Sequence, residues 1–230
     1  DFSNEAFRLL RALTPDLSKS SLRDKRFRQG DIFITGDDSQ RIFNRGNDLW
    51  RCGINVRAKR TRRLTLNYRT TAENRSAGLV VLENDPVKLR RSRTSREPYQ
   101  DEVCVSPRTG ARPELYAAHG LEDEAGWIAS RIVALQNADR SYRLSDFVVA
   151  AHSKERRDEY LKAISARGIA AVALEKEDRS AVNAVRVSTL HRLKGLEFKA
   201  VFIAGADEGK MPSESALARG RDALEEKEVM

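Results

Sequence analysis

Cysteine and histidine are scarce in this 230-residue chain, which has two cysteines and three histidines. Cys52 and Cys104 stand alone, without a CxxC motif or the Cys/His spacing that suits a zinc ion. The scarcity argues against a disulfide scaffold and against a structural metal site. It fits a reducing compartment, so we expect a cytoplasmic protein of the bacterial type.

Long apolar runs are missing as well. No stretch approaches the roughly 20 residues that a membrane-spanning helix needs, and we expect no membrane association. No signal peptide is visible. The chain opens on Asp1-Phe2-Ser3 without a methionine and closes on EEKEVM, and we expect it to be a fragment of a longer protein.

A phosphate-binding P-loop is also absent from the sequence. GADEGKM (205–211) contains Gly-Lys but lacks the GxxxxGK spacing and the Ser or Thr that follows it. We therefore expect that this polypeptide does not hydrolyse ATP by itself.

Positive charge, by contrast, is present in excess. Lys and Arg outnumber Asp and Glu by 42 to 34, for a formal net charge of +8. The chain is 33% charged and 40% hydrophobic, which suits a globular protein with a core. The surplus favours a polyanionic partner such as nucleic acid, although many basic proteins bind none, so charge alone fixes neither fold nor target.

Helical and strand-like apolar patterns alternate along the chain. The patterns predict helices at 4–13, 70–84, 121–136 and 154–168, and strands at 31–36, 113–120, 146–151, 169–174, 185–190 and 200–205. The alternation predicts an α/β fold with a mainly parallel sheet covered on both faces, in three layers. Ligands of such sheets bind beyond the carboxyl ends of strands, where GDDSQ (36–40) and HRLKGLE (191–197) lie.

Two polar segments follow predicted strands or loops and allow two interpretations each. GDDSQRIF (36–43) offers two carboxylates and an amide to a metal-bound phosphate or an activated water, or it is an Asp-rich turn that caps backbone groups. LTLNYRT (64–70) places a tyrosine that can stack on a base beside an arginine that can pair with a phosphate. The alternative is a core tyrosine beside a solvated arginine.

A third segment, VRVSTLHRLKGLEF (185–198), interrupts an apolar region with polar groups. Thr189 and His191 offer hydrogen bonds, Lys194 a positive charge, Gly195 room for close backbone approach, and Glu197 an acceptor for a sugar hydroxyl. His191 is alternatively a satisfied core histidine and Lys194 a solvated helix end. Several such groups between two apolar strands favour a functional turn.

Taken in order, the three segments resemble motifs of the UvrD/Rep-type superfamily 1 DNA helicases. GDDSQRIF is similar to motif III (GDxxQSIY), and LTLNYRT is similar to motif IV (LxxNYRS). VSTLHRLKGLEFKAVFIAGADEGKMP (187–212) is similar to motif V and its continuation, TxHxxKGLEFxxVFxxGxxxGxxP. The last match is long and specific.

The resemblance implies an organisation in two RecA-like domains with ATP between them. Residues 1–62 would be the tail of the first domain and a connector, and residues 63–230 would be the second domain, truncated before motif VI. It also implies that ATP and Mg²⁺ are the cofactors, with the magnesium ligands mostly outside this chain, and that single-stranded or partly duplex DNA is the partner.

Individual roles follow from the same resemblance. Gln40 would sense the γ-phosphate or orient the attacking water, and Arg69 would act as an arginine finger. Tyr68 would stack on adenine, Glu197 would bind the ribose, and Gly195 would let the backbone approach the nucleotide. The residues that would contact the DNA backbone are Thr189, His191 and Lys194.

The chain departs from the family pattern in two places. Phe43 stands where Tyr is common, and Asn44-Arg45-Gly46 replaces a longer aromatic-containing run that carries a base-stacking residue. The short spacing between Gly168 and motif V leaves no room for an accessory domain, as in compact helicase-related members. The sequence thus predicts part of an ATP-dependent DNA helicase or translocase of DNA repair or replication. The alternative is a non-catalytic RecA-like module that binds nucleic acid or a repair partner.

Overall fold

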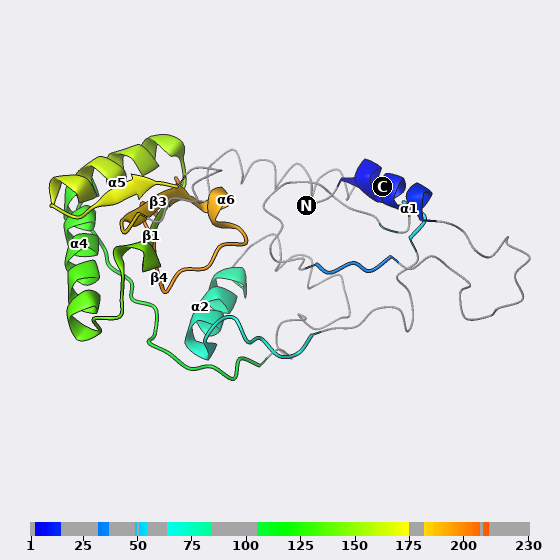
Figure 1. Ribbon diagram of the computed structural model, residues 1–230, viewed down its shortest axis with the longest axis horizontal. Coiled ribbons are helices and arrows are strands. Elements are labelled where there is room, and N and C mark those ends of the chain that lie inside the picture. The colour runs from blue at the N-terminus through cyan, green and yellow to red at the C-terminus, as the bar shows by residue number, and fades with distance from the viewer. Residues whose placement is uncertain are drawn as a thin grey trace, which may run out of the picture. The chain divides into compact units, whose positions relative to one another are not determined.

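The chain divides into two compact units, Asp1–Arg112 and Pro113–Met230. The computed structural model describes residues 3–14, 32–36, 49, 51–54, 64–83, 105–174, 182–207 and 209–211 (Figure 1). The expected domain boundary after residue 62 stays a prediction, since residues 55–63 lie outside the described residues. Each unit is taken by itself below.

The first unit contains two described helices, α1 (Asn4–Leu13) and α2 (Ala72–Glu83), as the apolar spacing predicted. Helix α1 begins where expected, because Ser3 Oγ accepts a hydrogen bond from the Ala6 N–H at 3.3 Å. Phe7 points from α1 into a small buried cluster with Cys52 and Ile54. This cluster anchors α1 to the segment around residue 52.

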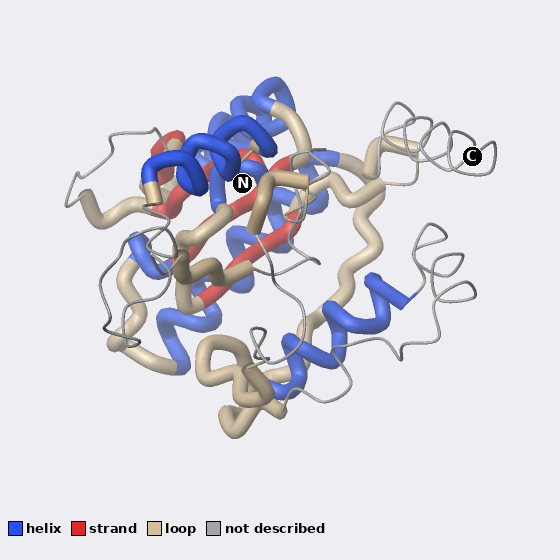
Figure 2. Tube along the Cα trace, turned by 90° about the vertical axis from the view of Figure 1, so that its right-hand side faces the viewer, coloured by secondary structure: helices blue, strands red, loops and turns tan. Residues whose placement is uncertain are grey.

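The second unit contains a four-stranded parallel sheet, which confirms the predicted α/β fold with a parallel sheet (Figures 1 and 2). The strands lie in the order β2-β3-β1-β4. Their bounds are β1 Phe147–Ala151, β2 Ala171–Ala173, β3 Val185–Thr189 and β4 Ala200–Ile203. β1 and β3 are the two central strands, and their residues are buried except for Thr189 at the end of β3, which is half-buried.

Two long helices, α4 (Leu121–Ala138) and α5 (Lys154–Ala166), cover one face of this sheet. Ile128 and Ile132 of α4 and Ile164 of α5 join alternate strand residues, such as Val149 and Val187, in one core. Alternate residues share a face because strand side chains have a period of two. Gly168 follows the C-cap residue Arg167 of α5 and has φ +78, as expected of a residue that ends a helix.

The opposite face of the sheet mixes buried and exposed side chains. Val148, Ala150 and Ser188 are buried there, whereas Val201 and Ile203 of β4 are 53% and 59% exposed. Because α4 and α5 both pack on the first face, the helical layer predicted for this second face stays a prediction. In the described part of the chain, no helix is long and apolar enough to cross a membrane.

Two predicted strands are wrong. Residues 32–36 and 113–118 have no strand structure, although both runs are rich in apolar or aromatic residues. Leu115 is fully exposed and Phe33 is 91% exposed, and neither segment pairs with a described strand. Without a neighbouring ladder, an apolar run has no hydrogen-bonding partner that would hold it as a strand.

Candidate functional site

The candidate turn after β3 lies at the carboxyl edge of the sheet, where the sequence placed it. β3 ends at Thr189, which is paired in register with Ala151, the last residue of β1. The short helix α6 (Leu190–Leu193) follows at once. The ends of the two central strands therefore bring residues 152–153 and 189–191 to the same edge.

The polar side chains of this turn face solvent. His191, Lys194 and Glu197 are exposed, and Thr189 is half-buried at the end of β3. A hydrogen bond from the Leu196 N–H to the Leu193 carbonyl (2.9 Å) closes the turn after α6. One local turn thus presents a hydroxyl, an imidazole, an ammonium group and a carboxylate within nine residues.

Gly195 gives this turn its shape. Its φ of +88 lies in the left-handed region, and a Cβ added there would meet nothing within 4 Å. The glycine is therefore required by backbone conformation and not by crowding. The open space beside it leaves the main chain accessible from outside.

The chain returns to the sheet after the turn through Lys199. Its ammonium group lies 2.8 Å from Asp146, the last residue of the 3-10 turn Leu144–Asp146, and 5.3 Å from the centroid of the Tyr142 ring. The hydrogen bond from Lys199, helped by the Arg143 N–H, lowers the pKa of Asp146. Asp146 is therefore ionised at neutral pH and anchors the start of β4, beside the start of β1.

In the first unit, the segment around Tyr68 and Arg69 forms a turn organised by Asn67. Asn67 Oδ1 accepts hydrogen bonds from the N–H groups of Arg69 (3.0 Å) and Thr70 (3.2 Å). Asn67 Nδ2 donates to Thr70 Oγ1 at 2.6 Å. Tyr68 is 67% exposed and Arg69 is also exposed, so this tyrosine is not a core residue.

The described residues 140–174, 182–207 and 209–211 lie within a match to a known family. The UvrD-like helicase C-terminal domain matches residues 140–230, which include β1 to β4 and the turn after β3. Residues 140–230 are thus similar to UvrD-like helicase C-terminal domains. The resemblance to UvrD-type helicases is thereby confirmed for this part of the chain, and it ties the protein to a helicase-related role.

Two curated proteins are similar to a shorter stretch. The DNA helicase II proteins of Escherichia coli (strain K12) and Salmonella typhimurium (strain LT2) are each 47% identical to this chain over 47 residues. The stretch covers 20% of this chain and 6% of either relative. The match supports the likeness to UvrD-type helicases. Because it spans so small a part of those proteins, it does not transfer their whole-protein activity to this chain.

The predicted site residues fall into three groups. Thr189, His191, Lys194, Gly195 and Glu197 lie together on the turn of the UvrD-like domain. The first unit holds Tyr68 and Arg69, next to each other. Gln40 lies outside the described residues, as does all of GDDSQRIF after Gly36.

Sequence reasoning missed a junction at the carboxyl edge of the sheet in the second unit. Glu124, in the first turn of α4, accepts hydrogen bonds from the Gly205 N–H (2.9 Å) and from the Tyr160 hydroxyl. Burial, together with the hydrogen bond to Glu124, raises the pKa of Tyr160 far above its ordinary value. Beside this junction, His152 Nδ1 is buried and has no hydrogen-bond partner among the described residues. Glu124 is 81 positions from Gly205, so no local pattern reveals the contact.

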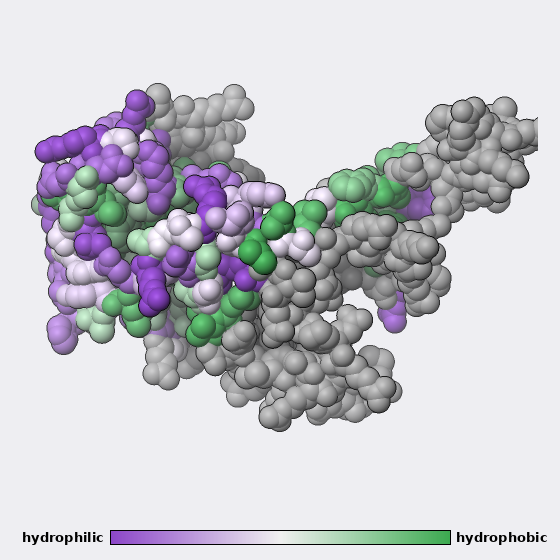
Figure 3. Space-filling view, turned by 90° about the horizontal axis from the view of Figure 1, so that it is seen from below, coloured by the Kyte–Doolittle hydropathy of each residue, from purple (hydrophilic) through white to green (hydrophobic). Residues whose placement is uncertain are grey.

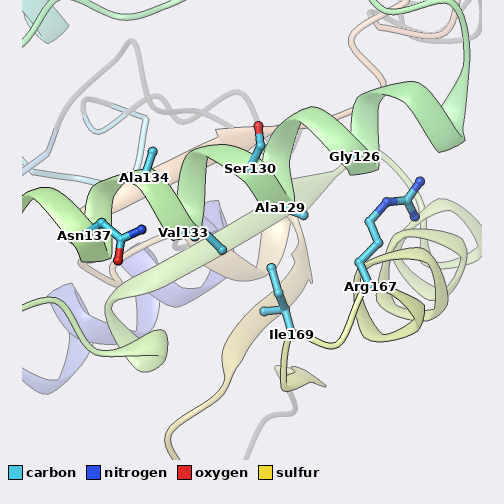
Figure 4. A pocket seen from close by; sticks show the side chains of 8 residues that line it. All are labelled: Gly126, Ala129, Ser130, Val133, Ala134, Asn137, Arg167 and Ile169. Carbon is cyan, nitrogen blue, oxygen red and sulfur yellow. The ribbon is translucent and has the colours of Figure 1, made fainter.

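A groove of about 520 Å³ lies elsewhere, along α4 (Figure 4). Small residues such as Gly126, Ala129 and Ser130 line it, together with Arg167 and Ile169. Arg167 and Ile169 lie between the end of α5 and the start of β2, at the amino edge of the sheet. None of the predicted site residues lines this groove.

Proposed function

We propose that this chain is part of an ATP-dependent DNA helicase or translocase that moves along single-stranded DNA. The observation that carries the proposal is the exposed turn at residues 189–197, on the carboxyl edge of a UvrD-like helicase C-terminal domain. The mixed hydroxyl, imidazole, ammonium and carboxylate groups there suit contacts with both a nucleic acid and a nucleotide. We place the function in DNA repair or replication in the cytoplasm.

Thr189, His191 and Lys194 are the proposed contacts to the DNA backbone. A hydroxyl and an imidazole donate hydrogen bonds to phosphate oxygens, and the lysine adds a positive charge. Such contacts read no bases, which suits a protein that must move along any sequence. The net charge of +8 supports binding to a polyanion.

Tyr68, Arg69, Gly195 and Glu197 are the proposed contacts to ATP, with Gln40 at the γ-phosphate. The exposed Tyr68 ring is free to stack on a base, and the open space beside Gly195 allows close approach of a ligand to the main chain. ATP hydrolysis would supply the free energy for movement. The resemblance supports the further proposal that the ligands of Mg²⁺ lie mostly outside this chain.

DNA binding by this chain tests the role of the turn. Titrating a fluorescein-labelled oligo(dT) and following its anisotropy, we expect Lys194→Ala to weaken binding severalfold. The slope of log K against log salt should become shallower by about 0.7, the change for one lost phosphate contact on a single strand. Lys162→Ala is the matched control, because Lys162 is an exposed lysine in the later half of α5, toward the opposite edge of the sheet.

Equal losses in the Lys194 and Lys162 variants would contradict a DNA-binding role for the turn, since both remove one positive charge. Loss of binding in His191→Ala with normal stability would support it further. Tight binding of the oligonucleotide by every variant would show that this turn takes no part in DNA binding.

ATP turnover by the full-length protein tests the catalytic part. We expect single-stranded DNA to stimulate its ATPase and Arg69→Ala to reduce the stimulated rate by about 1000-fold, the effect of removing an arginine finger. The isolated 230-residue chain should show no turnover, because its sequence has no P-loop. Binding of DNA without turnover by the full-length protein would instead indicate a non-catalytic module. Normal stimulated turnover in the Arg69 variant would remove that residue from the mechanism.

A further inference from the structure

Residues 105–110 run beside the Tyr68–Arg69 turn, and we call them the clasp. At its first residue, Val105, the clasp pairs with Leu66 in an isolated parallel β-bridge. The Val105 N–H donates to the Thr65 carbonyl (2.8 Å), and the Asn67 N–H donates to the Val105 carbonyl (2.9 Å). These two bonds fix the residues that precede the turn.

The clasp also holds the residues that follow the turn. The Ala72 N–H donates to the Arg108 carbonyl at 2.8 Å, and the Gly110 N–H donates to Glu73 Oε2 at 2.8 Å. Arg108 Nη1 adds a long contact of 3.5 Å to the Tyr68 carbonyl itself. Because the clasp is hydrogen-bonded to the residues before and after the turn, it sets the direction in which the Tyr68 and Arg69 side chains leave the main chain.

Gly110 is the point where this arrangement leaves no spare room. A Cβ added to Gly110 would lie 2.9 Å from Thr71 Cγ2, closer than real side chains pack. Gly110 is not among the glycines with a positive φ, so the restriction there is steric. Thr71 has little freedom to move away, because its Oγ1 accepts a hydrogen bond from the Asn74 N–H at 3.3 Å at the start of α2.

We infer that Gly110 is a positioning residue for the proposed nucleotide site. By leaving room for Thr71, it lets the clasp close on both sides of Tyr68 and Arg69. A methyl group at position 110 pushes the clasp away from Thr71 and loosens the turn, although position 110 itself touches no ligand. The inference rests on the proposed function only for the identity of the ligand.

Hydrogen exchange in the 230-residue chain tests the geometry without any nucleotide. We expect Gly110→Ala to speed exchange of the Asn67 and Ala72 amides by about tenfold, since both hydrogen bonds belong to the clasp. Thr71→Ser removes Cγ2 and keeps the capping hydroxyl, so the double variant Gly110→Ala/Thr71→Ser should restore slow exchange. Gly78→Ala is the control, because an added Cβ in that part of α2 meets nothing within 4 Å. Unchanged exchange in Gly110→Ala, or no rescue by Thr71→Ser, overturns the inference.

Binding of a fluorescent ATP analogue, mant-ATP, to the full-length protein tests the link to the nucleotide. We expect Tyr68→Ala and Gly110→Ala each to raise its Kd severalfold, with the Thr71→Ser second change rescuing only the Gly110 variant. Rescue distinguishes positioning from general loss of structure. If Tyr68→Ala weakens binding and Gly110→Ala does not, the positioning role is wrong. If Tyr68→Ala and Arg69→Ala both leave Kd unchanged, the proposed nucleotide role fails, whereas the exchange results still decide the clasp.

Discussion

At the level of single residues, Glu124 holds together three separate pieces of the second unit. Its carboxylate joins the first turn of α4, the buried Tyr160 of α5 and the main chain at Gly205 after β4. A carboxylate that accepts two hydrogen bonds is satisfied despite its partial burial. Removing either donor leaves one oxygen of the Glu124 carboxylate without its hydrogen bond.

Tyr160→Phe tests this junction through the pH dependence of stability. At pH 8 we expect the variant to lose about 1–2 kcal/mol of unfolding free energy, because Glu124 loses one donor. Above the ordinary tyrosine pKa of about 10, the unfolded chain releases the Tyr160 proton while the folded chain keeps it, since burial raises that pKa. The unfolded state then binds fewer protons, so the stability of the wild type falls with rising pH through this residue.

Phenylalanine has no proton to release, so the stability gap between wild type and variant should narrow above pH 10. Urea unfolding followed by circular dichroism, at pH 8 and at pH 10.5 to 11, measures the gap. A gap that stays constant over this range would show that Tyr160 ionises as readily in the fold as in the unfolded chain, and a gap that widens would show that it ionises more readily in the fold.

The residues of the candidate site differ in how far the sequence could reveal them. Thr189, His191, Lys194, Gly195 and Glu197 lie within nine positions, so the pattern of one segment sufficed to place them on one turn. Asn67 stands beside Tyr68 in the sequence, but its role in shaping the turn depends on side-chain hydrogen bonds that composition does not specify. The contacts of Glu124 and Gly110 join residues 81 and 37 positions apart, and they follow only from the fold.

At the level of elements, the junction of β3 and α6 depends on one backbone conformation. The turn has to leave the sheet and return to it as β4 within ten residues, from Leu190 to Lys199. Gly195 adopts φ +88 in open space to do so. An L-residue with a Cβ adopts this conformation at a cost of about 1–2 kcal/mol, and Asn pays less than Ala.

Gly195→Ala should therefore destabilise the second unit by about 1 kcal/mol, with Gly195→Asn closer to the wild type. The measurement is urea unfolding of the three proteins, together with hydrogen exchange of the Leu196 amide that closes the turn. Because a Cβ added at position 195 would meet no atom within 4 Å, steric crowding contributes to the cost of neither substitution. Equal losses for Ala and Asn would show that conformation is not what the glycine provides.

The elements also show where apolar patterns succeed and fail. The helices α1, α2, α4 and α5 and the strands β1 to β4 were all predicted, because amphipathic periodicity and short apolar runs bounded by turns are strong local signals. The runs at 31–36 and 113–120 have the same local appearance but no paired strand among the described residues. A strand exists only through its neighbour, and that information lies elsewhere in the chain.

At the level of the whole molecule, polar and apolar residues are distributed differently inside and outside. Hydrophilic side chains occupy much of the described surface in Figure 3, with smaller hydrophobic areas between them. Among the described residues, the buried cluster of the second unit comes from α4, α5, the strands and Ala204 just after β4. All three strand ladders also join residues between 147 and 203. The described members of this buried cluster and of these ladders all belong to the unit Pro113–Met230.

Residues 113–230 should therefore fold without residues 1–112. We expect the shorter protein to unfold cooperatively in urea and to keep the near-ultraviolet circular dichroism of Trp127, whose ring stacks on Tyr116 at 4.8 Å and meets the edge of Phe202. Ile128→Ala opens a cavity in the core between α4 and the sheet. It should lower the free energy of unfolding by about 2–5 kcal/mol in the shorter protein and in the 230-residue chain alike. Exposed Val133→Ala on the same helix is the control and should cost far less. A non-cooperative transition, or an Ile128 effect that disappears in the shorter protein, would show that the sheet depends on the first 112 residues for its fold.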